Sequence, residues 1–284
     1  MSAYQLVKRA LQSASGYGAV VRAKCPFCVI KGHSTNKKNL SFDKRNGKWF
    51  CYRCHSSGAI HGYQPAVEYA QRDNSINVYE PPLGWTSVMS HHPQAVKARE
   101  YAVKKRKLDL VSIAAAELGT VTLRERLPTQ DQDWRNRLIV PIKSLTGEWL
   151  GYVGRDFSGR SELPYMYVRG MARGSFLYNQ SALYTSTTKP VFVVEGTLDA
   201  VYLWPDAVAL LGMWTDQQIE ILCTTERPIV VLLDGDAWKK GEALADILRM
   251  YGKQAGSVRL GPKLDPDDMS RSWLRSEGMK CLGT

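Results

Sequence analysis

Two apolar runs in the last third of the chain restrict its fold more than any other feature. Each run starts with proline, continues through β-branched and aliphatic residues, and ends at acidic residues next to glycine: Pro190–Gly196 (PVFVVEG) and Pro228–Asp236 (PIVVLLDGD). Strands that are apolar at every position are typical of a parallel sheet that is buried on both faces. The sequence therefore predicts an α/β fold with a parallel sheet in residues 189–284.

The acidic residues that end these runs predict a metal site. Because the carboxyl ends of parallel strands share one edge of the sheet, we expect Glu195, Asp234 and Asp236 to lie together there. Asp199 starts a helical stretch four residues after Glu195, so it can face the same edge, and a further acidic cluster follows at Leu264–Asp268 (LDPDD). So many carboxylates favour Mg²⁺ or Mn²⁺ and suit two-metal phosphoryl chemistry. Ordinary solvated acids at loop ends are the alternative.

Near the start of the chain, four cysteines form two Cys-x-x-Cys pairs that are separated by 22 residues: Cys25, Cys28, Cys51 and Cys54. Two-residue spacing lets both thiolates of a pair face one tetrahedral ion, so we expect one structural Zn²⁺ ion per chain. The residues on either side of Arg45–Gly47 predict a β-hairpin with an Asn-Gly turn. The pattern therefore indicates a zinc ribbon in residues 1–63.

The formal charge of +11 is unevenly distributed along the chain. Residues 20–63 hold nine basic side chains and one acid, whereas residues 189–284 hold 11 basic and 14 acidic side chains. This asymmetry suits a polyanion bound by one part and metal-assisted chemistry in another. With Phe42, Trp49 and Tyr52, which we expect to be exposed, the basic ribbon suits a single-stranded nucleic acid. A purely structural ribbon with a solvated charged face is the alternative.

The segment between these two parts contains a predicted linker and a basic helical stretch. Residues 64–86 are polar and include the sequence PPLG, which predicts the linker. Residues 91–119 have a helical pattern, with six basic residues between Lys97 and Lys107. These basic residues suit a solvated face and a second nucleic-acid contact equally.

A second hairpin is predicted from the apolar runs Trp134–Ile142 and Trp149–Arg155, which a short turn joins. Arg135, Arg137 and Arg155 lie at the ends of these runs. Such arginines pair with local acids or grip a phosphodiester or a triphosphate.

The motifs EGTLDA (195–200) and LLDGDAWKKG (232–241) resemble those of TOPRIM domains, which are Rossmann-like α/β domains. Together with CPFC and CYRC before them, and RNRLIVPI and GEWLGYVGR between, they make the chain similar to the DnaG-type DNA primases from about Lys24 to Asp268. Four thiols are closer to the zinc ribbons of bacteriophage primases than a Cys-His-Cys-Cys set. The chain departs from the family where Ala237–Gly241 (AWKKG) replaces an early Ala-Gly. It also lacks the phosphate-loop motif of a fused helicase.

The resemblance implies a DNA-directed RNA polymerase that makes short RNA primers on single-stranded DNA from ribonucleoside triphosphates. It implies template recognition by residues 1–63, a basic amino-terminal subdomain of the polymerase core in residues 87–188, and a TOPRIM subdomain in residues 189–284. About two Mg²⁺ or Mn²⁺ ions would be held by six carboxylates: Glu195, Asp199, Asp234, Asp236, Asp265 and Asp267. Template and nucleotide would be guided by five basic residues: Arg135, Arg137, Arg155, Lys239 and Lys240. A replicative helicase would act in trans.

Two alternatives share the same motifs: a TOPRIM nuclease, and a non-catalytic DNA-binding protein or recombination mediator. The number of clustered carboxylates argues against the non-catalytic protein. No apolar run has the length of a signal peptide or a membrane span. We therefore expect a cytoplasmic protein without a membrane partner, in the cytoplasm of the bacterial host if a phage encodes it.

Overall fold

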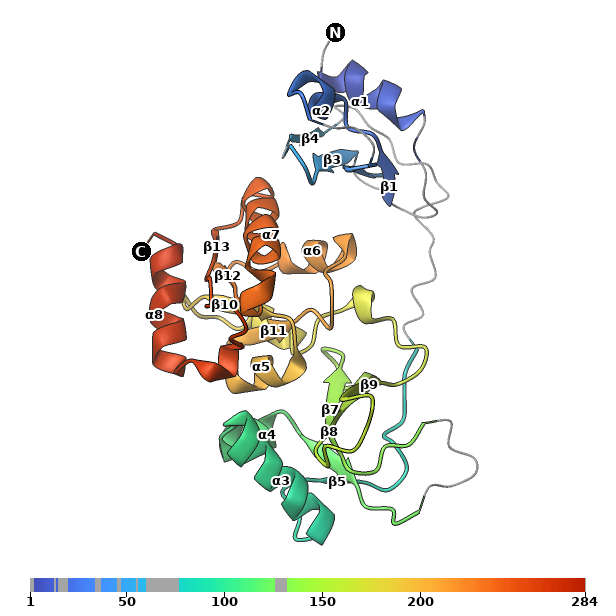
Figure 1. Cartoon of the computed structure of the whole chain (residues 1–284), viewed down its shortest axis with the longest axis vertical. Helices are drawn as coiled ribbons and strands as arrows, with labels where there is room; N and C mark the ends of the chain where they lie inside the picture. Colours follow the sequence, from blue (N-terminus) through green and yellow to red (C-terminus); the bar gives the residue numbers. More distant parts are fainter. Residues whose placement is uncertain are drawn as a thin grey trace. The chain divides into compact units, whose positions relative to one another are not determined.

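The computed structural model describes residues 3–12, 14, 20–33, 37–44, 47–54, 56–59, 77–125 and 132–283. The chain divides into two units, Met1–Ser75 and Ile76–Thr284 (Figure 1). No helix in the described ranges has the length and the apolar composition that crossing a membrane requires.

The first unit is built on an antiparallel sheet with the strand order β1-β2-β3-β4. Its strands and helices are β1 (Val20–Ala23), β2 (Leu40–Asp43), β3 (Lys48–Cys51), β4 (Ser57–Ala59), α1 (Ala3–Leu11) and α2 (Pro26–Ile30). The pairing of β2 with β3 confirms the predicted hairpin, although Arg45 and Asn46 of its turn lie outside the described residues. Helix α1 packs against α2 and β1 (Figure 1).

Two aromatic residues that we expected on the surface of the ribbon are buried in its core. Phe42 and Trp49 face each other across β2 and β3, and the Trp49 ring stacks on Phe27 with 5.0 Å between ring centroids. The reason is position: Phe42 and Trp49 occupy the same face of the hairpin, and this face packs against the helices and the cysteines. Tyr52, just after β3, remains half-exposed and lies 4.7 Å from the Arg22 guanidinium.

The second unit begins with an antiparallel sheet whose strand order is β5-β6-β7-β8-β9. Its elements are β5 (Trp85–Ser87), α3 (Pro93–Arg106), α4 (Leu110–Ala115), β6 (Gly119–Val121), β7 (Arg137–Lys143), β8 (Trp149–Asp156) and β9 (Tyr165–Tyr167). The long pairing of β7 with β8 confirms the second predicted hairpin. Strand β7 is the central strand of this sheet, and its residues are buried along almost its whole length.

Part of the predicted linker belongs to this sheet. Residues 64–76 lie outside the described residues, but the Tyr79 amide donates to the Trp149 carbonyl at 2.7 Å, and β5 begins at Trp85. The prolines and the glycine of this segment led us to predict a linker. In the structure, Trp85 packs edge-on against Trp149 and fixes the segment to the sheet.

The predicted parallel sheet follows, with the strand order β11-β10-β12-β13, and each neighbouring pair of these four strands is parallel. Its elements are β10 (Val191–Val194), α5 (Thr197–Tyr202), β11 (Ala207–Ala209), α6 (Asp216–Leu222), β12 (Ile229–Val231), α7 (Trp238–Met250), β13 (Ala255–Ser257) and α8 (Arg271–Cys281). Short 3-10 turns η4 (Gly235–Ala237) and η5 (Pro266–Asp268) carry acidic residues at its carboxyl edge.

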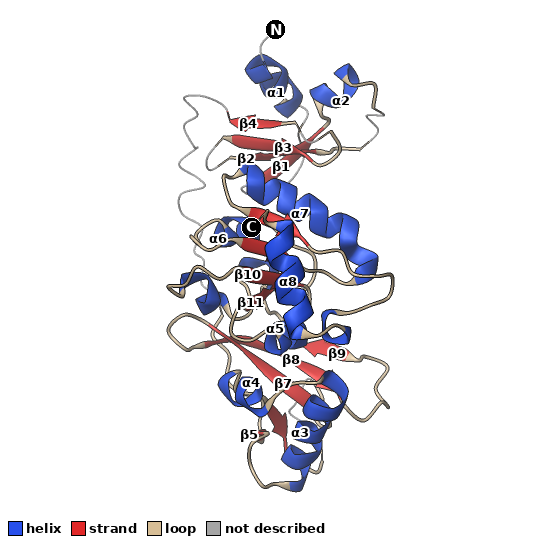
Figure 2. Cartoon of the chain, turned by 90° about the vertical axis from the view of Figure 1, so that its left-hand side faces the viewer, coloured by secondary structure: helices blue, strands red, loops and turns tan. Residues whose placement is uncertain are grey.

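The two sheets of the second unit share one hydrophobic core. Leu138 and Val140 of β7 belong to the same buried cluster as Val194 of β10 and Leu198 of α5. Helix α5 packs on β10 and β11 (Figure 2), and α7 packs on β12 and β13 (Figure 1). The antiparallel and parallel sheets are therefore joined by continuous packing.

Candidate metal centres and nucleic-acid-binding residues

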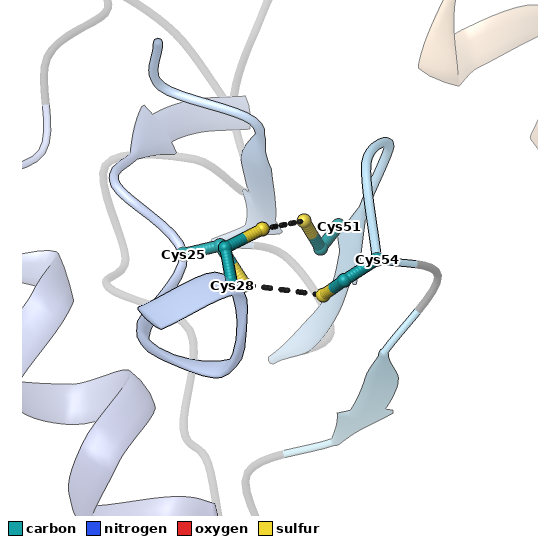
Figure 3. A group of neighbouring side chains, drawn as sticks. All are labelled: Cys25, Cys28, Cys51 and Cys54. Carbon is teal, nitrogen blue, oxygen red and sulfur yellow. Dashed lines mark hydrogen bonds between the residues drawn. The ribbon is translucent and has the colours of Figure 1, made fainter. Parts of the chain in front are cut away.

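The four predicted zinc ligands of the first unit converge on one point (Figure 3). Cys25 caps α2, Cys28 lies within it, Cys51 ends β3 and Cys54 follows in the next turn. The four thiols are buried, and all four sulfur atoms lie within 4.8 Å of one another.

The spacing of the sulfur atoms fits a tetrahedral ion rather than disulfides. The Sγ atoms of Cys25 and Cys54 are 3.7 Å apart, and those of Cys28 and Cys51 are 3.5 Å apart. Zn–S bonds of about 2.3 Å place sulfurs about 3.8 Å apart in a tetrahedron, whereas a disulfide needs about 2.05 Å. Burial raises the pKa of the Cys28 thiol to about 11, and a bound cation would lower this pKa and hold Cys28 as a thiolate. The cluster therefore supports a structural zinc ion.

The acidic centre of the second unit lies at the carboxyl edge of the parallel sheet. Glu195 follows β10, Asp234 follows β12, and Asp199 is buried in the first turn of α5. The carboxylates of Asp265, Asp267 and Asp268 gather at η5, with ligand atoms within 4.8 Å of one another. The centre is built from three separate segments of the chain, at residues 195–199, 234–236 and 265–268.

One glycine brings two of these segments together. A Cβ atom on Gly235 would lie 1.9 Å from the Gly261 carbonyl oxygen, and the Gly235 amide donates to the Leu264 carbonyl at 2.8 Å. Only a residue without a side chain allows this approach. The contact holds the Asp-Gly-Asp turn against the loop that leads to Asp265.

Burial and mutual repulsion raise the pKa values of these acids. Burial is the main cause for Asp199, whose pKa rises to about 7, and for Asp234, whose pKa rises to about 6. Neighbouring carboxylates raise both further, since Asp265 acts on each of them and Glu195 acts on Asp234. Such a group of acids favours a bound cation. Asp236 is more exposed, and its Oδ1 accepts a hydrogen bond from the Lys263 amide at 3.3 Å.

A basic residue that the sequence did not single out enters this centre. Arg106, the last residue of α3, places one guanidinium nitrogen 3.3 Å from Asp199 Oδ1 and 3.3 Å from Asp267 Oδ2. Its neighbour Lys107 donates from Nζ to the Asp267 carbonyl at 2.6 Å and lies 3.5 Å from Asp268 Oδ1. The only signal in the sequence was the group of six basic residues between Lys97 and Lys107.

The three predicted arginines of the β7–β8 hairpin differ in what surrounds them. Arg137 is buried and donates to the Gly154 and Leu163 carbonyls and to Ser161, so its side chain is used within the fold. Arg135 forms a fork with Asp133 through Nε and a terminal nitrogen.

Arg155 differs from both, because it combines partial exposure with aromatic contacts. It donates from Nε to the Tyr101 hydroxyl at 3.1 Å and lies 4.5 Å from the centre of the Tyr165 ring. The electrostatic interactions of Tyr165 with Asp199 and Arg106 place the ring beside the acidic centre.

The residues that depart from the family pattern form a stacked basic group. Lys239 and Lys240 are exposed at the start of α7. The Trp238 ring lies 3.8 Å from the Arg259 guanidinium and 5.4 Å from Lys239 Nζ. Arg259 follows β13, so two strand ends contribute to this surface next to the Asp-Gly-Asp turn.

Comparisons with known proteins agree with this architecture. No protein-family model matches the chain. A DNA primase of Halalkalibacterium halodurans is 27% identical over 179 residues, which are 58% of this chain and 29% of the relative. A DNA primase of Staphylococcus epidermidis is 24% identical over 186 residues, 59% of this chain and 30% of the relative. The match thus spans less than a third of each relative's length.

Solved primase structures share the fold. The zinc-binding and RNA polymerase domains of the Aquifex aeolicus primase match 98% of this chain and 82% of their own, with a TM-score of 0.54 and 19% identity. The chain resembles the DnaG-type DNA primases. The E. coli primase catalytic core covers 69% of this chain and 74% of its own at 25% identity and a TM-score of 0.51. A DnaG catalytic domain bound to single-stranded DNA covers 68% and 77%, at 21% identity and a TM-score of 0.54.

One further aromatic–basic contact of this primase-like core was not predicted from the sequence. Arg173 lies 4.5 Å from the centre of the Tyr167 ring, and Tyr167 interacts electrostatically with Glu195. Tyr165 and Tyr167 are two residues apart on β9, so they share a face of this strand. Strand β9 has only three residues, and neither its position nor its partners could be expected from so short a run.

Proposed function

We propose that this chain is a DNA primase, which makes short RNA primers on single-stranded DNA from ribonucleoside triphosphates. One observation carries the proposal: carboxylates from β10, β12 and η5 meet at one edge of a parallel sheet. The names of the two curated relatives support it. A solved DnaG catalytic domain with single-stranded DNA has the same fold as this chain, which supports single-stranded DNA as the template.

The acidic residues would hold about two Mg²⁺ or Mn²⁺ ions, with Glu195, Asp234, Asp236 and Asp265 as the exposed or half-exposed ligands. When bound, such ions stabilise charge on an α-phosphate and lower the pKa of a primer 3′-hydroxyl. The chain's own residues orient the substrate. In this proposal Arg155, which Tyr101 and Tyr165 hold in position, binds the triphosphate. The pyrophosphate leaves on the side of the centre where Arg155 lies.

The basic surface around Trp238 would bind the nucleic-acid backbone. Lys239, Lys240 and Arg259 have exposed side chains, and none of the described acidic residues forms an ion pair with them. Arg137 has no place in this set, because its guanidinium donates to the carbonyls of Gly154 in β8 and of Leu163 in the loop before β9.

The ribbon would recognise the template through its basic residues and Tyr52, which the neighbouring Arg22 holds in place. The four-thiol ligand set supports a primase of bacteriophage type. We include a replicative helicase as a partner acting in trans, and we keep the division of the second unit into residues 87–188 and 189–284 as part of the proposal.

Primer synthesis tests the proposal directly. Wild-type protein is incubated with a library of single-stranded DNA templates, labelled ribonucleotides and Mg²⁺ or Mn²⁺, beside Asp234→Ala. Asp246→Ala is the matched control, because this acid lies on the exposed side of α7 and pairs with Arg249. We expect short RNA products with wild type and the control, and none with Asp234→Ala. DNA binding without RNA products on any template would contradict a self-sufficient primase, and metal-dependent DNA cleavage would indicate a nuclease.

A further inference from the structure

The guanidinium of Arg106 occupies a position in the acidic centre that a cation would be expected to fill. Asp199 comes from α5 and Asp267 from η5, and both place a carboxylate oxygen 3.3 Å from the same guanidinium nitrogen. We propose that Arg106 is a fixed cation of this centre, which holds Asp199 and Asp267 and leaves the divalent ions to the other carboxylates. This inference rests on the metal site of the proposed function.

The surroundings of Arg106 keep its side chain in place. The exposed fraction of the side chain is 16%, and those of the Asp199 and Asp267 side chains are 10% and 8%. Nε is fully enclosed and has no hydrogen-bond partner among the described residues. Withdrawing the guanidinium would leave two buried carboxylates without a counter-charge, which is costly.

The end of α3 anchors the same contact from the backbone side. Lys107 adopts a left-handed conformation (φ 53°) that ends the helix, and its Nζ binds the carbonyl of Asp267. Two residues further, the Asp109 carboxylate lies 2.7 Å from Arg271, at the start of α8. The chain that follows Arg106 is therefore tied at two points, through Lys107 and Asp109, to the segment that carries Asp267.

The consequence concerns which acids bind metal. We counted Asp199 and Asp267 among the six metal ligands expected from the sequence, but their closest oxygens face Arg106. Glu195, Asp234, Asp236 and Asp265 remain for divalent ions. The positive charge of Arg106 repels divalent ions that bind to these four carboxylates. Removing this charge should therefore strengthen the binding of a divalent ion about tenfold.

Titration of the full, zinc-loaded chain with Mn²⁺ tests this, by calorimetry and by the electron paramagnetic resonance signal of free Mn²⁺. The variants are Arg106→Gln, Arg106→Lys and, as the matched control, Lys104→Gln, which removes an exposed charge from the same helix. We expect Arg106→Gln to bind Mn²⁺ about tenfold more tightly than wild type, or to bind one more ion. Arg106→Lys and Lys104→Gln should resemble wild type. An unchanged titration of Arg106→Gln, or an equal gain in Lys104→Gln, would overturn the proposal.

A second pair of variants tests the same proposal without touching Arg106, in case Arg106→Gln fails to fold. Asp267→Asn should keep the full number of Mn²⁺ ions, while Asp234→Asn should lose at least one. Loss of an ion in Asp267→Asn would overturn the role of Arg106. Absence of Mn²⁺ binding by wild type would overturn both the metal centre and this inference. Primer synthesis by wild type together with an unchanged Arg106→Gln titration would overturn the inference alone.

Discussion

The two candidate metal centres of this chain differ in where the positive charge that neutralises their ligands comes from. In the ribbon, four thiols are buried in a small core, and the nearby Lys31 Nζ donates to the Cys54 carbonyl, so most of the neutralising charge has to come from the ion. In the acidic centre, part of the neutralising charge comes from Arg106 of the protein itself. The first centre should therefore depend on its ion for folding, whereas the second should be able to form without one.

The largest effect is expected from removing a zinc ligand. Cys51→Ser should abolish zinc binding and the cooperative unfolding of residues 1–75, because ion binding of about 10 kcal/mol or more contributes to the folding of such small domains. The second unit, with its own core, should unfold at an unchanged temperature. Zinc content and a thermal unfolding scan measure both effects. Cys223→Ser in the second unit is the control and should keep zinc. A single transition that moves as a whole would contradict the independence of the two units.

A smaller effect is expected where the acidic centre is held together by backbone contact. Gly235→Ala places a Cβ atom against the Gly261 carbonyl, so the Asp-Gly-Asp turn must move, with a loss of about 2 kcal/mol in the free energy of unfolding. Gly261→Ala in the facing loop is the control, since its Cβ would meet only the flexible end of Leu264. Chemical denaturation measures the two losses. Equal losses would mean that the close approach does not determine the geometry of the centre.

The smallest effect is the pH dependence of the second unit without added divalent ions. The folded-state pKa values of Asp199 (about 7) and Asp234 (about 6) lie above the usual value of 3.8, so the folded state binds more protons than the unfolded state between about pH 4 and 7. The free energy of unfolding should therefore fall as the pH rises through this range, and the Tm of the second unit should fall with it.

Mn²⁺ should reverse much of this loss, because it favours the charged carboxylates. The slope with pH should be smaller in Asp199→Asn, and Asp246→Asn serves as the control, since this acid is half-exposed, pairs with Arg249 and lies outside the centre. A stability that rises with pH, or an Asp199→Asn slope equal to that of wild type, would show that these acids are not perturbed as described.

The elements with strong local signals were predictable from the sequence. The paired cysteines, the two apolar runs with acidic ends and both hairpins depend on residues that are close along the chain. The contacts of Arg106 and the short strands β5, β6 and β9 were not predictable, because they depend on partners that are distant in sequence. Phe42 and Trp49 show the same limit: aromatic residues in a basic segment suit both a binding face and a core, and only the packing of α2 against the hairpin decides between them.

The hydrogen bond from Lys107 to the Asp267 carbonyl has a consequence for how the protein is made. The two residues are 160 positions apart. Forming this contact of the acidic centre therefore closes one of the longest loops in the second unit. Contacts of this kind form late in folding and slow it. A ribosome that has finished the ribbon and both sheets still carries an incomplete centre until η5 has emerged. The order of synthesis thus delays the assembly of the centre until nearly the whole second unit is available to support it.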